Sequence, residues 1–100
     1  MRVKTDIIML IPKGADNRIT AKEIKKLTDI PDVTVRHIVN AARANFIPIA
    51  SDPKGYFIAE NPDELDHTIA QINSRIHKMI QAREGLKKAQ RLMREANNNV

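Results

Sequence analysis

Residues 19–55 read ITAKEIKKLTDIPDVTVRHIVNAARANFIPIASDPKG, and this stretch contains the strongest local signals in the chain. Thr20 and Glu23 match a capping box, in which each side chain accepts a hydrogen bond from the other residue's backbone N–H. The box predicts a helix over residues 21–29. Pro31 ends that helix, because a proline excludes helical dihedrals from the residue before it.

The helix over residues 21–29 has an apolar side and a basic side. We expect Ile24 and Leu27 to be buried. The basic side is expected to face solvent and consists of Lys22, Lys25 and Lys26. Lys25 or Lys26 could touch a phosphate, although an ordinary solvated surface is the simpler interpretation.

A second helix follows the turn after Pro31. Asp32 is expected to cap it, and the apolar spacing carries it over residues 33–44. Its apolar face consists of Val35, Ile38, Val39 and Ala42. Its polar face consists of Thr34, Arg36, His37, Asn40 and Arg43. We therefore expect one side to pack in a core and the other side to face solvent.

A β-hairpin is predicted over residues 47–59. Its turn is Asp52-Pro53-Lys54-Gly55, which has the residue preferences of a type I turn and places Lys54 at the tip. Residues 18–20 are expected to form a short strand that pairs with the hairpin. A helix, a tight turn, a second helix and a hairpin together predict a winged helix-turn-helix domain over residues 1–60, in an α+β fold that is mainly helical.

The chain before this stretch is ambiguous between two structures. Val3, Ile7, Leu10 and Ile11 share one face at helical spacing, which predicts a helix over residues 1–11. The unbroken apolar run of residues 7–11 would also suit a buried strand.

Residues 61–100 predict one long helix. Asn61 is expected to cap it, with Pro62 at the first helical position. A heptad seam follows, made of Leu65, Ile69, Ile72, Ile76, Met79, Leu86 and Met93. Arg83 and Gln90 are the polar residues at the remaining seam positions. Unbroken, such a helix would span about 50 Å, and we expect the seam to join two copies of the chain. Folding back on its own domain is the alternative, and Gly85 is a possible break.

Composition limits the class of protein. The 100 residues carry a net charge of +5 and contain no cysteine, which excludes disulfides and thiolate metal sites. No apolar run approaches the roughly 18 residues that a membrane span needs. These features favour a cytoplasmic protein with an anionic partner. From residue 75 onward the basic residues are Arg75, Lys78, Arg83, Lys87, Lys88, Arg91 and Arg94. We expect these basic residues to form a solvated surface, and the alternative is a second contact with phosphate.

Several motifs resemble small winged-helix proteins encoded by bacteriophages and prophages. The motifs are Ile11-Pro12-Lys13-Gly14, residues 19–24, residues 33–39, residues 47–51, Gly55-Tyr56-Phe57 and residues 61–65. The resemblance covers roughly residues 7–80. It implies a winged-helix fold, binding of double-stranded DNA and a bacterial host cell as the location, but it supplies no regulatory target.

The leading functional hypothesis is a homodimeric DNA-binding protein that acts in transcriptional or replicative control. The helix over residues 33–44 would enter the major groove, where Thr34, Arg36 and His37 would contact bases first and Asn40 next. Arg43 is expected to contact phosphate, and Lys54 to reach the flanking backbone. The alternative is a winged-helix module that binds a host or phage protein. We predict no catalytic site, cofactor or metal.

Overall fold

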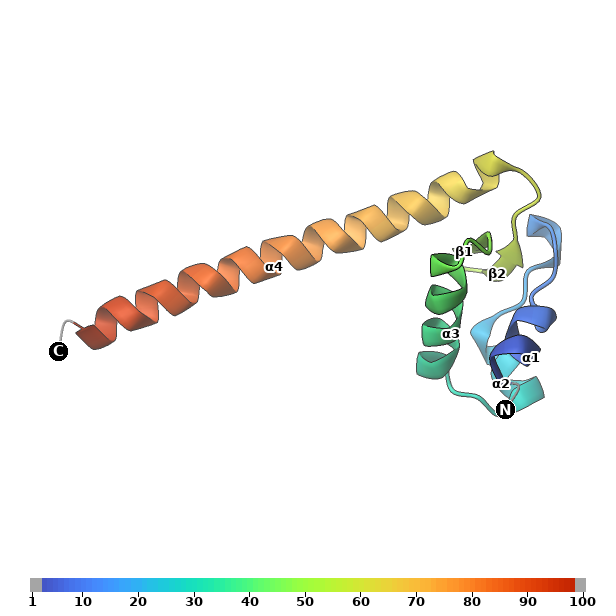
Figure 1. Ribbon diagram of the computed structural model, residues 1–100, viewed down its shortest axis with the longest axis horizontal. Coiled ribbons are helices and arrows are strands. Elements are labelled where there is room, and N and C mark those ends of the chain that lie inside the picture. Colours follow the sequence, from blue (N-terminus) through green and yellow to red (C-terminus); the bar gives the residue numbers. More distant parts are fainter. Residues whose placement is uncertain (1–2, 99–100) are drawn as a thin grey trace. The chain divides into compact units, whose positions relative to one another are not determined.

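The computed structural model describes residues 3–98, and the side chains of residues 7–98. The fold is mainly helical, with one small antiparallel hairpin and a long last helix (Figure 1). In order, the elements are α1 Val3–Leu10, η1 Ala15–Asn17, α2 Ala21–Thr28, α3 Asp32–Ala44, β1 Ile49–Asp52, β2 Gly55–Ile58, η2 Pro62–Leu65 and α4 Asp66–Asn98. The chain divides into two units, residues 1–68 and residues 69–100.

The first element is a helix, so the strand interpretation of residues 7–11 is wrong. Ile7 and Ile11 are both buried, as the helical spacing predicts, and Leu10 is half-buried. The side chain of Val3 lies outside the described side chains. Because α1 packs against both α2 and α3, its apolar face forms one wall of the core.

The capping box at the start of α2 is confirmed. The N–H of Glu23 donates to Thr20 Oγ1 and the N–H of Thr20 donates to Glu23 Oε1, both over 3.0 Å. Ile24 is fully buried, but Leu27 is 67% exposed, so its predicted burial is wrong. On α2, Ile24 is buried and Thr28 half-buried, whereas Leu27 lies on the opposite flank of Ile24 and is exposed.

Helix α3 begins one residue earlier than predicted, and its predicted cap is wrong. Pro31 is the N-cap residue, and its carbonyl accepts from the N–H of Val35. Asp32 is the first helical residue and makes no capping hydrogen bond. Its carboxylate still lies in the first turn, where negative charge suits the helix dipole. The predicted buried face is confirmed in full: Val35, Ile38, Val39 and Ala42.

The hairpin is shorter than the predicted span of residues 47–59. Strand β1 pairs antiparallel with β2, with Asp52 opposite Gly55, so that Pro53 and Lys54 form a two-residue turn. The short strand predicted for residues 18–20 is present as a single bridge. Ile19 exchanges two backbone hydrogen bonds with Tyr56, of 2.9 and 2.8 Å.

Gly55 is the residue that permits this bridge to form so close to the turn. Its φ is +136°, a region that side chains rarely adopt. A Cβ at this position would lie 2.5 Å from the carbonyl oxygen of Ile19. A glycine is therefore required here for both its backbone conformation and its small size.

The core of the first unit is aliphatic. Its buried cluster consists of Ile7, Ile11, Ile24, Val35, Ile38, Val39, Ala42 and Ile49. Phe57 is also buried, and Tyr56 packs against the cluster while half-buried. The cluster contains only isoleucine, valine and alanine, and no leucine belongs to it.

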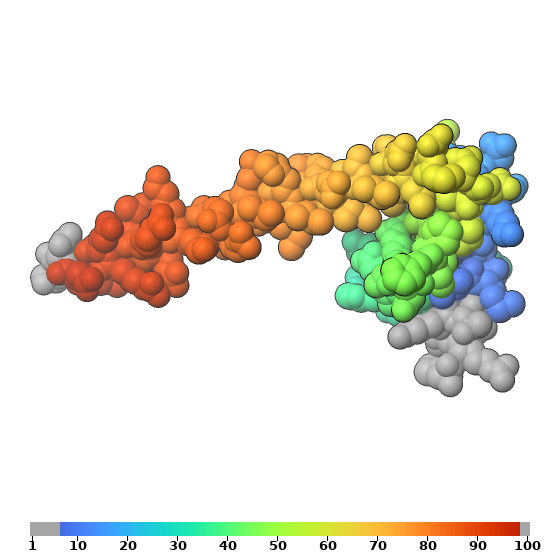
Figure 2. Space-filling model, turned by 45° about the horizontal axis from the view of Figure 1, so that its top comes forward, coloured from blue at the N-terminus to red at the C-terminus, as the bar shows by residue number. Residues whose placement is uncertain are grey.

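The last helix is preceded by a single 3-10 turn. Asn61 Oδ1 accepts from the N–H of Glu64 as the predicted cap, but the segment that it caps is η2, and α4 starts at Asp66. Helix α4 then continues through Gly85 without a break. In the space-filling view, the segment from orange to red is one helix thick (Figure 2).

Candidate nucleic-acid interface

Helix α3 presents a polar face to solvent. Thr34, Arg36, His37 and Asn40 are all exposed. The residues between them on the helix are the buried ones, so the polar face follows directly from the amphipathic spacing. The structure also exposes Val33, at 56%, in the first turn of this face. Its methyl groups could contact a thymine methyl, an apolar contact that DNA-reading helices use.

Arg43 differs from the other polar residues of α3. It is half-buried, and its Nε donates to the carbonyl oxygen of Ile49 over 2.8 Å. A terminal nitrogen donates to Ser51 Oγ over 3.1 Å, and the other lies 3.4 Å from Asn40 Oδ1. The guanidinium therefore fixes the end of α3 to β1. Arg43 therefore supports the candidate interface by holding the hairpin in its orientation relative to α3.

Thr68 continues this connection on the outer edge of β1. Its hydroxyl accepts from the N–H of Ser51 over 3.0 Å and lies 3.2 Å from the carbonyl oxygen of the same residue, to which it donates. Thr68 is only 4% exposed. A chain of polar contacts thus runs from α3 through Arg43 and Ser51 to the first turn of α4.

The base of the hairpin turn is held by an ion pair. Arg18 Nε donates to Asp52 Oδ2 over 2.7 Å, and the guanidinium carbon lies 5.3 Å from the centre of the Phe57 ring. The N–H of Lys54 donates to Asp52 Oδ1 over 2.9 Å. Burial by itself would raise the pKa of Asp52. The hydrogen bond from Arg18, the N–H groups of Lys54 and Gly55 and the charge of Arg18 outweigh burial and lower the pKa.

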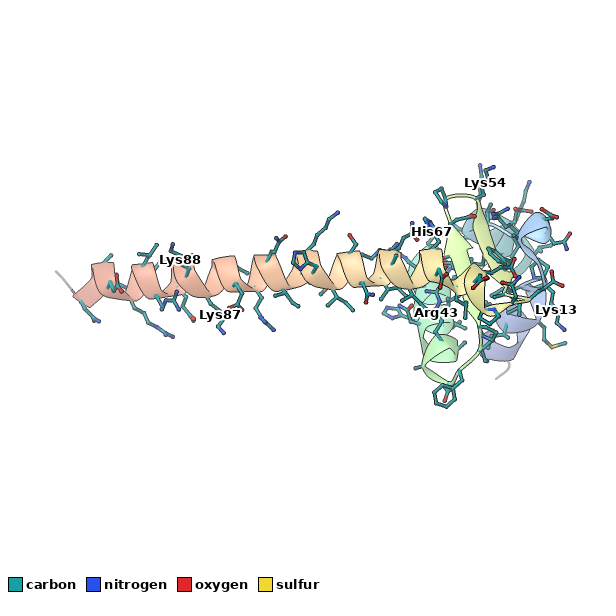
Figure 3. All side chains as sticks on the ribbon, turned by 90° about the horizontal axis from the view of Figure 1, so that it is seen from above. Lys13, Arg43, Lys54, His67, Lys87 and Lys88 are labelled. Carbon is teal, nitrogen blue, oxygen red and sulfur yellow. The ribbon has the colours of Figure 1, made fainter. Side chains whose placement is uncertain are left out.

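Lys54 stands at the tip of this supported turn. Its side chain is exposed and points away from the hairpin (Figure 3). Lys25 and Lys26 are exposed on α2. The structure therefore leaves the amine groups of all three lysines accessible to a ligand.

A shallow cleft lies beside the ion pair. It is lined by Ala15, Arg18, Ser51, Asp52, Phe57, Asp63, Glu64, His67 and Thr68. Arg18 and Asp52 pair with each other, and Thr68 bonds to Ser51, so these polar groups have partners within the fold. In the described part of the chain, no three His, Asp or Glu side chains stand close enough together to hold a metal ion.

The residues predicted for self-association are placed along η2 and α4. Ile69, Ile76, Met79, Leu86 and Met93 are all exposed, and Leu65 and Ile72 are half-buried. Within residues 3–98, no helix combines the length and the apolar character that crossing a bilayer requires.

Two residues that position this surface were absent from the sequence prediction. Arg18 precedes the short bridge and gives no local signal of an ion pair 34 positions away. Thr68 looks like any polar residue in the first turn of a helix. The spacing of α3, in contrast, contained enough information to identify Val33 as an exposed first-turn residue.

Comparison with protein-family models, curated proteins and solved structures finds no match to this chain.

Proposed function

We propose that this protein is a phage-type winged-helix protein that binds double-stranded DNA in transcriptional or replicative control. The observation that carries the proposal is the exposed polar face of α3 beside a hairpin that hydrogen bonds from Arg43 and Thr68 hold in place. Arginine, asparagine and threonine on one helix face are the side chains that read base edges in the major groove. The net charge of +5 has the sign that phosphate contacts require.

The proposed contacts divide into two kinds. Arg36 donates to guanine, Asn40 pairs with adenine, and Thr34 and His37 contact bases near the start of α3. Lys54 contacts phosphate at the hairpin tip, with Lys25 or Lys26 as further backbone contacts. Arg43 is reserved for the link between α3 and β1, because its guanidinium already donates to Ile49 and Ser51.

We also propose that α4 joins two copies of the chain through its first half. There the seam is apolar without interruption: Ile69, Ile72, Ile76 and Met79. The later seam positions include Arg83 and Gln90, which weaken a self-contact. A two-fold dimer of this kind would present two α3 helices and favour a roughly palindromic site.

Fluorescence anisotropy with random-sequence duplexes at low salt tests the DNA proposal. Arg36→Ala and Lys54→Ala should each weaken binding. Lys54→Ala should also reduce the magnitude of the slope of log affinity against log salt by about 1, because Lys54 contacts phosphate, whereas Arg36→Ala should reduce the preference among duplex sequences, because Arg36 contacts a base. Lys13→Ala is the matched control, since Lys13 is also an exposed lysine of the first unit but lies outside α3 and the hairpin tip. Equal effects of Lys54→Ala and Lys13→Ala would count against a specific surface.

Phe46 favours a second candidate function, a protein-interaction module. This residue is 94% exposed and has a φ of +70°. A bulky residue in the left-handed region costs free energy and often marks a functional surface. Binding of a protein partner would support this candidate over DNA if the binding tolerates high salt, survives nuclease treatment and is lost in Phe46→Ser.

A further inference from the structure

Helix α4 carries two apolar seams rather than one. The first contains Ile69, Ile72, Ile76, Met79 and Ile80. The second contains Met79, Ala82, Leu86, Ala89, Met93 and Ala96. The second seam alternates a large residue and an alanine at steps of three and four, without any polar interruption. At 3.6 residues per turn, its centre lies about 100° around the helix from the centre of the first.

This rotation separates the two halves of α4 as binding surfaces. The straight continuation of the first seam is a cationic stripe, formed by Arg83, Lys87, Arg91 and Arg94. A helix that covers the first seam and runs straight on would meet these charges rather than the apolar residues. The second seam therefore requires a partner of its own.

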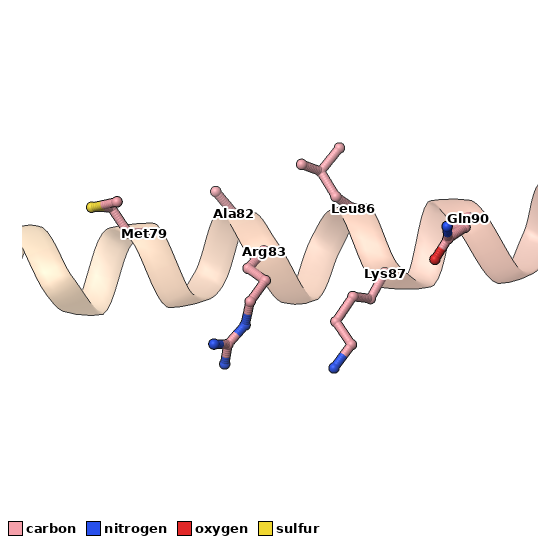
Figure 4. Close-up of a pocket in the computed structure, with 6 residues that line it drawn as sticks. All are labelled: Met79, Ala82, Arg83, Leu86, Lys87 and Gln90. Atoms are coloured by element: carbon pink, nitrogen blue, oxygen red, sulfur yellow. The ribbon is translucent and has the colours of Figure 1, made fainter.

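The second seam has the shape of a helix-docking surface. Met79 and Leu86 project from the same side of α4 with Ala82 between them, and the small alanine leaves a hollow (Figure 4). The long side chains of Arg83, Lys87 and Gln90 border that hollow. Met79 and Leu86 are each 72% exposed. A side chain from a second helix would fill such a hollow as a knob fills a hole.

The charges beside the seam indicate the chemistry of that second helix. Lys78 and Arg83 lie on opposite sides of the second seam along α4, at the positions that flank a coiled-coil core. Arg83 also borders the hollow. Glu84 already lies 2.9 Å from Arg83 and 3.8 Å from Lys87. For Lys88, Arg91 and Arg94, no ion pair is present among the described residues.

A second copy of α4 matches these charges poorly. In a parallel pair, Lys78 of one copy would face Arg83 of the other at both edges, and like charges at these positions are destabilising. In either orientation, two strongly cationic segments would lie side by side. Carboxylates on the partner would instead pair with both edges.

We propose that residues 79–96 of α4 bind an acidic amphipathic helix of another protein. Met79, Leu86 and Met93 supply the apolar contacts. The alanines allow the two helix backbones to approach closely. Lys78 and Arg83 select for glutamate or aspartate at the flanking positions of the partner.

The test uses the full chain and synthetic helical peptides of about three heptads with a leucine and alanine seam. One peptide carries glutamate at the flanking positions, and its control carries lysine. In fluorescence anisotropy, the glutamate peptide should bind at least about tenfold more tightly than the lysine peptide. Ala82→Gln should weaken that binding by a similar factor, because the longer side chain fills the hollow. Ala70→Gln makes the same change at an exposed position of α4 outside both seams, and it should leave binding unchanged.

Three outcomes would overturn the proposal: no binding of the glutamate peptide, equal binding of both peptides, or equal effects of Ala82→Gln and Ala70→Gln. Sedimentation analysis of the full chain tests whether a second copy of the chain, rather than another protein, covers this seam. If Ala82→Gln abolishes self-association of the full chain, a second copy covers this seam and the proposal is wrong. The DNA affinity of Ala82→Gln is measured in parallel and should equal that of wild type, so failure here is distinguishable from failure of the proposed DNA function.

Discussion

Replacing Thr68 with valine removes a hydroxyl while keeping the shape of the side chain. In the native protein, that hydroxyl makes two hydrogen bonds to the backbone of Ser51, and Thr68 is almost fully buried. Each hydrogen bond contributes about 0.5–1.5 kcal/mol, so Thr68→Val should lower the unfolding free energy by about 1–3 kcal/mol. In a domain of this size, a loss of 2 kcal/mol lowers the melting temperature by roughly 8–16 °C.

Urea unfolding of the full chain measures this loss, and amide hydrogen exchange locates it. The N–H of Ser51 should exchange faster in Thr68→Val, because its hydrogen-bond acceptor is gone. Thr68→Ser keeps the hydroxyl and loses one methyl group, which costs about 0.8 kcal/mol. If Thr68→Val is as stable as wild type and the exchange at Ser51 is unchanged, the proposed link between β1 and α4 does not contribute to stability.

Three further predictions concern the remaining supports of the domain. Gly55→Ala should destabilise the fold by at least about 1 kcal/mol in thermal unfolding, through its positive φ and the close approach of Ile19. Its control, Gly85→Ala, has open space around the added methyl and should stabilise α4 by roughly 1 kcal/mol, seen as greater helicity on heating. Asp52→Asn should be less stable than wild type at pH 7; because the native pKa of Asp52 is lowered, the difference should shrink as the pH falls below about 4 in urea titrations. Arg43→Ala should lower the unfolding free energy by about 2 kcal/mol, because its guanidinium donates to Ile49 and Ser51. Arg36→Ala, at an exposed position without a described partner, should change it by under about 0.5 kcal/mol. Equal losses of the two variants in urea unfolding would refute a structural role for Arg43.

Local patterns in the sequence were sufficient for α2, α3, the long helix α4 and the hairpin turn, whereas residues 1–11 fitted a helix or a strand. The capping box at Thr20 depends only on residues three apart, and it forms as predicted. The buried face of α3 follows from helical spacing, which also predicts which side chains of that helix face solvent. The two failures within helices, Leu27 and Asp32, arose where several side chains could satisfy the same local rule. Packing against α1 and α3 selected Ile24 over Leu27, and Pro31 took the cap position.

The tertiary structure determined which polar groups support the candidate site and which remain available to bind. The sequence does not distinguish Arg43 from Arg36, because both are arginines on the polar face of the same helix. Only the nearby carbonyl of Ile49 and hydroxyl of Ser51 turn Arg43 into a support for the hairpin. Arg18 and Asp52 are similarly brought together over a separation of 34 positions. Helical periodicity and capping act over a few residues and can be recognised from the sequence, whereas these pairings depend on how distant segments pack, which no local pattern encodes.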